Sequence, residues 1–253
     1  MTFDVPAEAY QRYMGRYSTP LAGQFVEITG VRRGDRVLDV GCGPGVLTAP
    51  LVELCGAENV AAVDPSAPFV AAARHSFPGV DVREASAEGL PFDDDAFDAA
   101  LAQLVVHFMA DPVAGLREMG RVTRPGGNVA ASVWDNAGSS GPLQVFWRAA
   151  REVDPSARDE GHLPGSREGH LAELAEAAGL RVRRSTSLTV SVHFSSFEEW
   201  WTPYLLGVGP GGSYVAGLDP EQRARVEDSC RRRFPDGEFD HGGTAWVVVA
   251  AAG

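Results

Sequence analysis

Residues 37–45, which read VLDVGCGPG, constrain the fold more than any other part of the sequence. Apolar residues surround one acid, Asp39, and lead directly into glycines at positions 41, 43 and 45. A short apolar run that ends in a glycine-rich turn is typical of a buried strand followed by a helix. In open α/β sheets the ends of such strands are where ligands bind. The segment therefore predicts an α/β fold with a ligand site at this turn.

Strand and helix patterns alternate through residue 134, which predicts a parallel, doubly wound α/β sheet with helices on both faces. Asp111 is a suitable cap for one of these helices, because Pro112 follows it at the first helical position. The predicted strands are 36–40, 59–63, 80–84, 98–102 and 128–133, and the predicted helices are 46–54, 67–75 and 112–122. RPGG at 124–127 is predicted as a turn before the fifth strand.

The regular alternation of strand and helix patterns stops after residue 134. We expect the rest of the chain to form the end of the sheet and an inserted cap. The predicted elements are helices at 143–153, 168–178, 197–206 and 220–234 and strands at 188–193 and 244–251, with 207–214 (GVGPGGSY) as a mobile loop. Residues 6–30 are predicted to be helical. The chain is thus divided into an N-terminal helical segment (1–30) over the site, a ligand-binding core (31–135), and a cap with sheet-closing strands (136–253).

Composition excludes several classes of function. The 253 residues suit one domain, and the net charge of −12 with no lysine argues against a broad nucleic-acid footprint. Three widely spaced cysteines show no zinc spacing, so no metal is expected. No secretory signal and no apolar run of membrane-spanning length is present, so we expect a reduced, cytoplasmic protein with no membrane partner. The oligomeric state stays open.

The glycine spacing and Asp39 together favour a cationic ligand. A dinucleotide fingerprint requires Gly or Ala at position 46, where this chain has Val46. A pyrophosphate would also face the Asp39 carboxylate with no arginine in the loop to offset it. S-adenosylmethionine carries a cationic sulfonium and a cationic amino group and suits such a site. A nicotinamide-dependent oxidoreductase and a purely structural turn are the alternatives.

A second acid, Asp64, ends the next predicted strand in the sequence VAAVDPS. It lies about 20 residues past the glycine turn, the usual spacing of an acid that binds ribose hydroxyls. A carboxylate there can accept hydrogen bonds from both hydroxyls. The alternative role for Asp64 is to cap the helix that begins near Ser66.

Four segments in this order, VLDVGCGPG, AAVDPS, EASAEGLPFDDDAFDAALAQ and REMGRVTRPGG, resemble the class I S-adenosylmethionine-dependent methyltransferases. The resemblance covers residues 36–134 and is strongest to the ubiquinone/menaquinone-type small-molecule branch. It implies a Rossmann-like, seven-stranded, mostly parallel sheet whose last strand is antiparallel. A methyltransferase is the main functional expectation, and a protein that binds S-adenosylmethionine without transferring a methyl group is a further alternative.

The resemblance also implies how the cofactor is bound. Gly41 and Gly43 would lie against the methionine part, Asp39 near its amino group, and Asp64 at the ribose. Ser86 and Ala87 would edge the adenine, although many relatives carry Asp where this chain has Ser86, and Gln103 would lie near the methionine end. The remaining residues implied at the cofactor are Cys42, Pro65 and the N-terminal Tyr13, Arg16 and Tyr17. The N-terminal three would close the site, with Arg16 pairing the methionine carboxylate, unless this segment is only a docked amphipathic helix.

His107 is the candidate catalytic base, because it follows the fourth predicted strand and imidazole titrates near neutral pH. A packing histidine is the alternative. The candidate wall for the methyl acceptor consists of Trp134, Trp200, Trp201 and Tyr204, whose alternative role is core packing. AQLV replaces the NPPY-like tetrapeptide of amine and nucleic-acid methylases, which favours O- or C-methylation of a small apolar or aromatic molecule.

Overall fold

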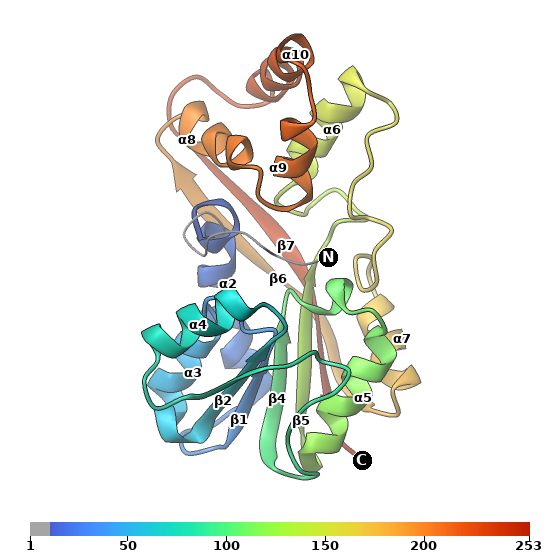
Figure 1. The fold of residues 1–253 in the computed structure, drawn as a ribbon. Helices are drawn as coiled ribbons and strands as arrows, with labels where there is room; N and C mark the ends of the chain where they lie inside the picture. The colour runs from blue at the N-terminus through green and yellow to red at the C-terminus, as the bar shows by residue number, and fades with distance from the viewer. Residues whose placement is uncertain (1–10) are drawn as a thin grey trace.

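The computed structural model describes residues 11–253 and shows one seven-stranded sheet (Figure 1). The strand order is β3-β2-β1-β4-β5-β7-β6, with β1 to β5 parallel and β7 antiparallel to both of its neighbours. The strands are β1 (Val37–Val40), β2 (Val60–Asp64), β3 (Asp81–Glu84), β4 (Phe97–Gln103), β5 (Thr123–Trp134), β6 (Arg181–Phe194) and β7 (Phe239–Ala251). The predicted Rossmann-like sheet with an antiparallel last strand is therefore confirmed.

Helices cover both faces of the sheet (Figure 1). One face carries α2 (Arg16–Thr29), α3 (Thr48–Cys55) and α4 (Ala67–Ser76), and the other carries α5 (Pro112–Val122) and α7 (His170–Ala177). Successive strand residues alternate between these layers: Val37 packs in the cluster that contains Phe25 of α2, and Leu38 packs in the cluster that contains Leu116 of α5. The Asp111 side chain caps α5 by accepting the N–H of Ala114 at 2.9 Å, as the sequence predicts.

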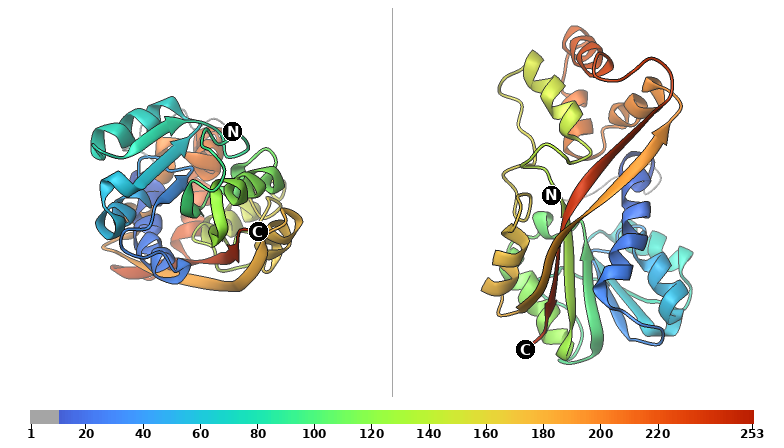
Figure 2. Two further views of the ribbon diagram at one scale, coloured as in Figure 1. Left: turned by 90° about the horizontal axis from the view of Figure 1, so that it is seen from below. Right: turned by 180° about the vertical axis from the view of Figure 1, so that it is seen from behind.

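The long strands β6 and β7 extend beyond the rest of the sheet into a second lobe (Figure 2). This lobe contains α6 (Gln144–Val153), α8 (Phe197–Trp201), η4 (Thr202–Leu206), α9 (Gly209–Ala216) and α10 (Pro220–Arg231). A single π-helical turn, η1 (Gln11–Gly15), leads into α2, and the short 3₁₀ turns η2 (Ala57–Asn59) and η3 (Val106–Phe108) complete the elements. Aromatic side chains of β6, α6, α8 and η4 form the core of the second lobe.

Several local predictions differ from the structure. The sequence predicts a loop at 207–214, but α9 begins at Gly209, because Pro210 suits a first helical turn. Gly212 of this helix packs closely on the preceding turn, since a Cβ there would lie 2.7 Å from the Gly207 carbonyl carbon. Residues 124–127 belong to β5, and the helix predicted at 197–206 divides into α8 and η4 at Thr202. The strands predicted at 188–193 and 244–251 begin earlier, at Arg181 and Phe239, because the two strands pair with each other over their whole length.

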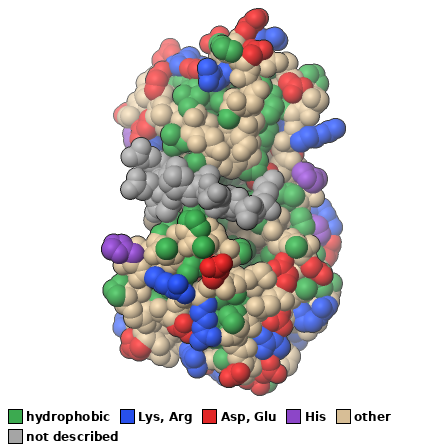
Figure 3. Space-filling model, viewed as in Figure 1, with side chains coloured by type: hydrophobic (Ala, Val, Ile, Leu, Met, Phe, Trp, Pro, Cys, Tyr) green, Lys and Arg blue, Asp and Glu red, His purple; other side chains and the backbone are tan. Residues whose placement is uncertain are grey.

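The first residues of the helix predicted at 6–30, and of the predicted N-terminal segment, lie outside the described residues. On the face shown in Figure 3, hydrophobic side chains are visible on both lobes, and charged side chains of both signs spread over the outer surface. Among the described helices, none is long and apolar enough to cross a membrane.

Candidate active site

The larger cavity lies at the carboxyl ends of the parallel strands and has a volume of about 550 Å³. The sheet order places it beside β1, from which the strand order runs outward in both directions, and open α/β sheets bind ligands at such a switch point. The predicted cofactor residues that line this cavity are Gly41, Gly43, Asp64, Pro65, Ser86, Ala87 and Gln103. Residues separated by up to 62 positions in the sequence thus meet at one site because their strands end at the same edge.

The glycine turn after β1 requires glycine at Gly41. This residue has a φ of 72°, and its N–H donates to the Val63 carbonyl at 2.8 Å, which ties the turn to the end of β2. A Cβ at Gly41 would lie 2.5 Å from Cγ2 of Val105, which also lines the larger cavity. The backbone of the turn therefore lies closer to Val105 than any side chain at position 41 would allow.

Asp64 holds the glycine turn and the start of α4 together. Its Oδ2 accepts the N–H of Gly43 at 2.8 Å, and its Oδ1 accepts the N–H of Ser66 at 2.8 Å. Burial raises the pKa of Asp64, and these two N–H groups oppose that effect. Each carboxylate oxygen can accept a further hydrogen bond, so the anchoring role and a ribose-binding role are compatible.

Asp39 lies beneath the glycine turn and does not line the larger cavity. Its side chain is on the same face of β1 as Val37, and its Oδ2 accepts the hydroxyl of Thr48, in the first turn of α3, at 2.6 Å. Burial raises the pKa of Asp39 to about 7, the Thr48 hydroxyl opposes this, and the charge of Asp64 adds to it. Cys42 is likewise buried outside the cavity wall.

The three N-terminal residues predicted at the cofactor contact the second lobe in this structure. Arg16 forms an ion pair with Glu199 of α8, and its guanidinium stacks on the ring of Phe194. Tyr17 is buried against Phe194, and Tyr13 packs edge-on against Tyr204. None of the predicted three lines the larger cavity. Through these contacts Arg16 holds η1 and α2 against the second lobe.

Gln103, at the end of β4, links α2 to the larger cavity. Its Nε2 donates to the Ser18 carbonyl of α2 at 3.0 Å, while its buried Oε1 has no hydrogen-bond partner among the described residues. The acids that line the cavity are Asp64, Glu84 and Glu88, and no arginine or histidine lines it within residues 11–253. This donor and acceptor set suits a ligand that carries positive charge and N–H or O–H groups.

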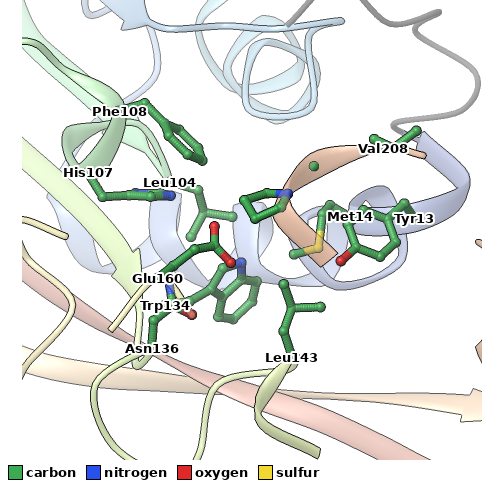
Figure 4. A pocket seen from close by; sticks show the side chains of 12 residues that line it. Tyr13, Met14, Leu104, His107, Phe108, Trp134, Asn136, Leu143, Glu160 and Val208 are labelled. Carbon is green, nitrogen blue, oxygen red and sulfur yellow. The ribbon is translucent and has the colours of Figure 1, made fainter. Parts of the chain in front are cut away.

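The smaller pocket adjoins the larger cavity and has a volume of about 40 Å³ (Figure 4). Leu104 and Phe108 line both spaces. The other residues that line the smaller pocket are Tyr13, Met14, His107, Trp134, Asn136, Leu143, Glu160, Val208, Gly209 and Pro210. Pockets that enclose small molecules have volumes of about 300–1,000 Å³, so a metabolite can enter only if these walls move apart.

His107, the predicted base, lines the smaller pocket from η3. It is 5% exposed, its ring packs on Phe108, and its Nδ1 has no hydrogen-bond partner among the described residues. Burial lowers the pKa of His107 to about 3. The imidazole is therefore neutral at physiological pH, and a group with so low a pKa is a weak general base.

The predicted aromatic wall separates into two groups. Trp134, at the end of β5, lines the smaller pocket, and its buried indole N–H has no partner among residues 11–253. Trp200, Trp201 and Tyr204 belong to the buried aromatic cluster of the second lobe and line neither the pocket nor the larger cavity. In the structure these three side chains pack in the core, which was the alternative role.

Glu160 is a further site residue, which the sequence pattern does not predict. It lies in the irregular segment between α6 and α7, is 7% exposed, and points its carboxyl toward the middle of the smaller pocket (Figure 4). Burial and then the charge of Asp159 raise the pKa of Glu160 to about 7, while the indole of Trp147 opposes the shift. Its sequence neighbourhood, ARDEGHLPG, has no periodicity that would predict a buried acid.

Comparison with known proteins agrees with this geometry. A family model described as a methyltransferase domain matches residues 38–131, which contain the glycine turn, Asp64 and Gln103. The uncharacterized protein Rv1403c of Mycobacterium tuberculosis is 34% identical over 238 residues, which is 86% of this chain and 82% of that protein. The chain belongs to the class I S-adenosylmethionine-dependent methyltransferases. The nicotinamide-dependent alternative is therefore set aside.

Two solved methyltransferases share the fold. A methyltransferase of Aquifex aeolicus matches with a TM-score of 0.56 at 18% identity and covers 96% of this chain and 93% of its own. The geranyl diphosphate C-methyltransferase of Streptomyces coelicolor, solved with S-adenosylhomocysteine, matches with a TM-score of 0.56 at 14% identity and covers 93% and 79%. These likenesses concern the fold of the methyltransferase.

S-adenosylmethionine is the cofactor of this methyltransferase, and the residues of the larger cavity fit it. The acids of the cavity complement the two cationic groups of this cofactor, and Asp64 can accept hydrogen bonds from its ribose hydroxyls. The unpartnered Oε1 of Gln103 can accept a hydrogen bond from the ligand's amino group. Among the described residues no group of three His, Cys, Asp or Glu side chains is placed to hold a metal ion.

Proposed function

We propose that this methyltransferase methylates an oxygen or carbon atom of a small apolar or aromatic metabolite that binds in the smaller pocket. The observation that carries the proposal is the shared wall: Leu104 and Phe108 line both the larger cavity and the smaller pocket. A bound acceptor would therefore lie next to a bound cofactor. The ubiquinone/menaquinone-type branch, the cytoplasmic location and the absence of a nucleic-acid partner stay part of this proposal.

The cofactor supplies an electrophilic methyl group on a positively charged sulfur. In this proposal Gly41 and Gly43 bind the methionine part through their backbone, Asp64 binds the ribose, and Ser86 and Ala87 edge the adenine. The protein then orients the acceptor, since alignment of reacting atoms can contribute about 7–11 kcal/mol. Leu104, Phe108 and Trp134 exclude water from the line between the two sites.

The apolar walls of the smaller pocket support an apolar acceptor. Leu104, Leu143, Val208 and Trp134 provide hydrocarbon surface, and only a few polar groups are interspersed. Because the pocket is small in this structure, we expect it to widen where α9 begins. Gly207 and Gly209 have φ values of 70° and 65° there, so the backbone between η4 and α9 can change direction without side-chain hindrance.

The test is a turnover screen read by mass spectrometry. The purified protein is incubated with S-adenosylmethionine and a panel of phenols, enols, isoprenoids, carboxylates and amines, and each sample is examined for S-adenosylhomocysteine and a singly methylated product. Formation of both with apolar hydroxyl or carbon acceptors supports the proposal. Binding of the cofactor without methylation of any compound would instead support a binder that does not transfer the group.

Calorimetry provides the matching control for the site assignment. We expect S-adenosylhomocysteine to bind and NADH not to bind, because the larger cavity is lined by acids and by no arginine among the described residues. Tight NADH binding with no S-adenosylhomocysteine binding would contradict the assignment.

A further inference from the structure

We infer that Glu160 removes a proton from the methyl acceptor, and that the acceptor is therefore an uncharged hydroxyl compound such as a phenol or an enol. This inference rests on the proposed function, since it concerns the chemistry inside the same pocket. It assigns a role to a residue from the irregular segment between α6 and α7.

Hydrogen bonds and an ion pair of the surrounding residues hold Glu160 in position. Its backbone carbonyl accepts the N–H of Leu163 at 3.0 Å and the hydroxyl of Ser166 at 3.1 Å. The adjacent Asp159 forms an ion pair with Arg151 of α6 at 2.6 Å, and its Oδ1 accepts the N–H of Gly161 at 3.1 Å. These contacts fix the turn on both sides of Glu160, so its carboxyl is held in the pocket wall.

The carboxyl of Glu160 is more than nine-tenths buried and forms no ion pair within residues 11–253. Its side chain points into the smaller pocket, toward the region between Leu104 and Trp134 (Figure 4). Leu104 separates this region from the larger cavity, which places the carboxyl on the acceptor's side of the shared wall. A buried carboxyl without a charged partner is costly, and such groups occur mainly where their chemistry is used.

No other described group in the pocket is a better base. His107 is neutral with a pKa near 3, and the Trp134 indole and the Asn136 amide do not accept protons. The pKa of Glu160, near 7, matches the pH at which a general base is most effective. The titratable and charged groups around Glu160 are Asp159, Arg151, His107, Tyr13 and Tyr204.

The charge of the Glu160 carboxylate also selects the acceptor. A carboxylate or phosphate acceptor would bring a second negative charge into an apolar pocket, where like charges repel strongly. A neutral hydroxyl can donate its hydrogen bond to Glu160. As the acceptor oxygen forms its bond to the methyl carbon, its proton passes to the carboxylate, and the carbon–sulfur bond breaks with its electron pair kept by sulfur. The proton later leaves Glu160 for water, so each turnover releases one proton.

The first test compares the wild type with Glu160→Gln, using Glu168→Gln as the control because Glu168 is exposed and lines neither site. The probes are phenol, catechol, 4-nitrophenol, benzoate and benzylamine. We expect Glu160→Gln to lower kcat on phenol and catechol by about 10²–10⁴-fold. We expect no loss, or a gain, on 4-nitrophenol, because it ionises in water near neutral pH, so that its anion needs no base and is repelled by the Glu160 carboxylate. Affinity for S-adenosylhomocysteine should not change in either variant.

The second test does not depend on activity. Because the pKa of Glu160 is raised from 4.5 to about 7 in the folded protein, the wild type should lose stability as pH rises through this range. Glu160→Gln should therefore unfold at a higher temperature than the wild type above pH about 7 and lose that advantage below pH about 4.5. Glu168→Gln should show no such crossover.

The outcomes separate this inference from the proposed function. Methylation of carboxylates or amines alone, equal loss on phenol and 4-nitrophenol, or a stability difference that does not vary with pH would overturn the role of Glu160. Absence of methylation of every hydroxyl probe by a protein that binds S-adenosylhomocysteine would also overturn it. Failure to bind S-adenosylhomocysteine would instead count against the proposed function.

Discussion

Leu104 and Phe108 form the wall between the larger cavity and the smaller pocket, and each side chain lines both. Leu104 achieves this position with a φ of 61°, which is unusual for a residue with a side chain. Its N–H donates to the Ser132 carbonyl of β5 at 2.8 Å, which holds the strained backbone in place. Strain of this kind is common at functional sites.

Replacing Leu104 with isoleucine tests the importance of this backbone. The volume is unchanged, but a side chain branched at Cβ is disfavoured at positive φ, so Leu104→Ile should lower the free energy of unfolding by about 1–3 kcal/mol. Urea denaturation measures this change. Leu104→Met, which is unbranched at Cβ, is the matched control and should cost less. Equal costs for both variants would show that strain at this position is not important.

Two glycines of the turn should differ in their tolerance of alanine. Gly41 and Gly43 both have positive φ, so an added Cβ costs about 1–2 kcal/mol at either position. At Gly41 the Cβ would also lie 2.5 Å from Val105, whereas no atom lies within 4 Å at Gly43. Gly41→Ala should therefore be the less stable variant and should bind S-adenosylhomocysteine more weakly, as denaturation and calorimetry can measure. A reversed order would contradict this account of the turn.

Asp64→Asn tests the assignment of the ribose site. The amide preserves the shape of the side chain but removes its charge, so S-adenosylhomocysteine should bind about 1.5–3 kcal/mol more weakly, the scale of hydrogen bonds to a charged group. Isothermal titration calorimetry measures the affinity, and circular dichroism checks the fold. Asp228→Asn, on the exposed surface of α10, is the control. Unchanged affinity in Asp64→Asn would remove Asp64 from the ribose site.

The ion pair between Arg16 and Glu199 should contribute to stability with a defined pH dependence. The hydrogen bond from Arg16 is the main cause that lowers the pKa of Glu199 from 4.5 to about 2. The contribution is therefore complete above pH 4.5 and is lost as pH falls toward 2. Both side chains are about one-third exposed, so Glu199→Gln should cost no more than about 1 kcal/mol at neutral pH.

A second variant, at Arg16 itself, tests where Arg16 acts. Because Arg16 is paired with Glu199 and lies outside the larger cavity, Arg16→Met should leave the affinity for S-adenosylhomocysteine nearly unchanged. A loss of affinity would support the expectation that Arg16 pairs the methionine carboxylate. Denaturation of both variants over acid pH, together with calorimetry, distinguishes the two roles.

The sequence by itself determined the sheet and the part of the site that follows from it. Strand and helix periods predict parallel strands whose carboxyl ends meet, which places Gly41 and Asp64 at one edge without a structure. The resemblance to the methyltransferases adds Ser86 and Gln103 at the same edge. Each of these residues lies next to a strand end, where local pattern and global position coincide.

Only the tertiary structure decided the rest of the site. Arg16 meets Glu199 across 183 residues, Trp200 and Trp201 turn into the core of the second lobe, and Glu160 enters the smaller pocket from a segment without periodicity. The period and spacing of residues in the sequence indicate which side chains are neighbours within one helix or strand. The contacts named here depend instead on how β6 and β7 position the second lobe relative to the sheet. That arrangement is set by packing between distant elements, which no local pattern records.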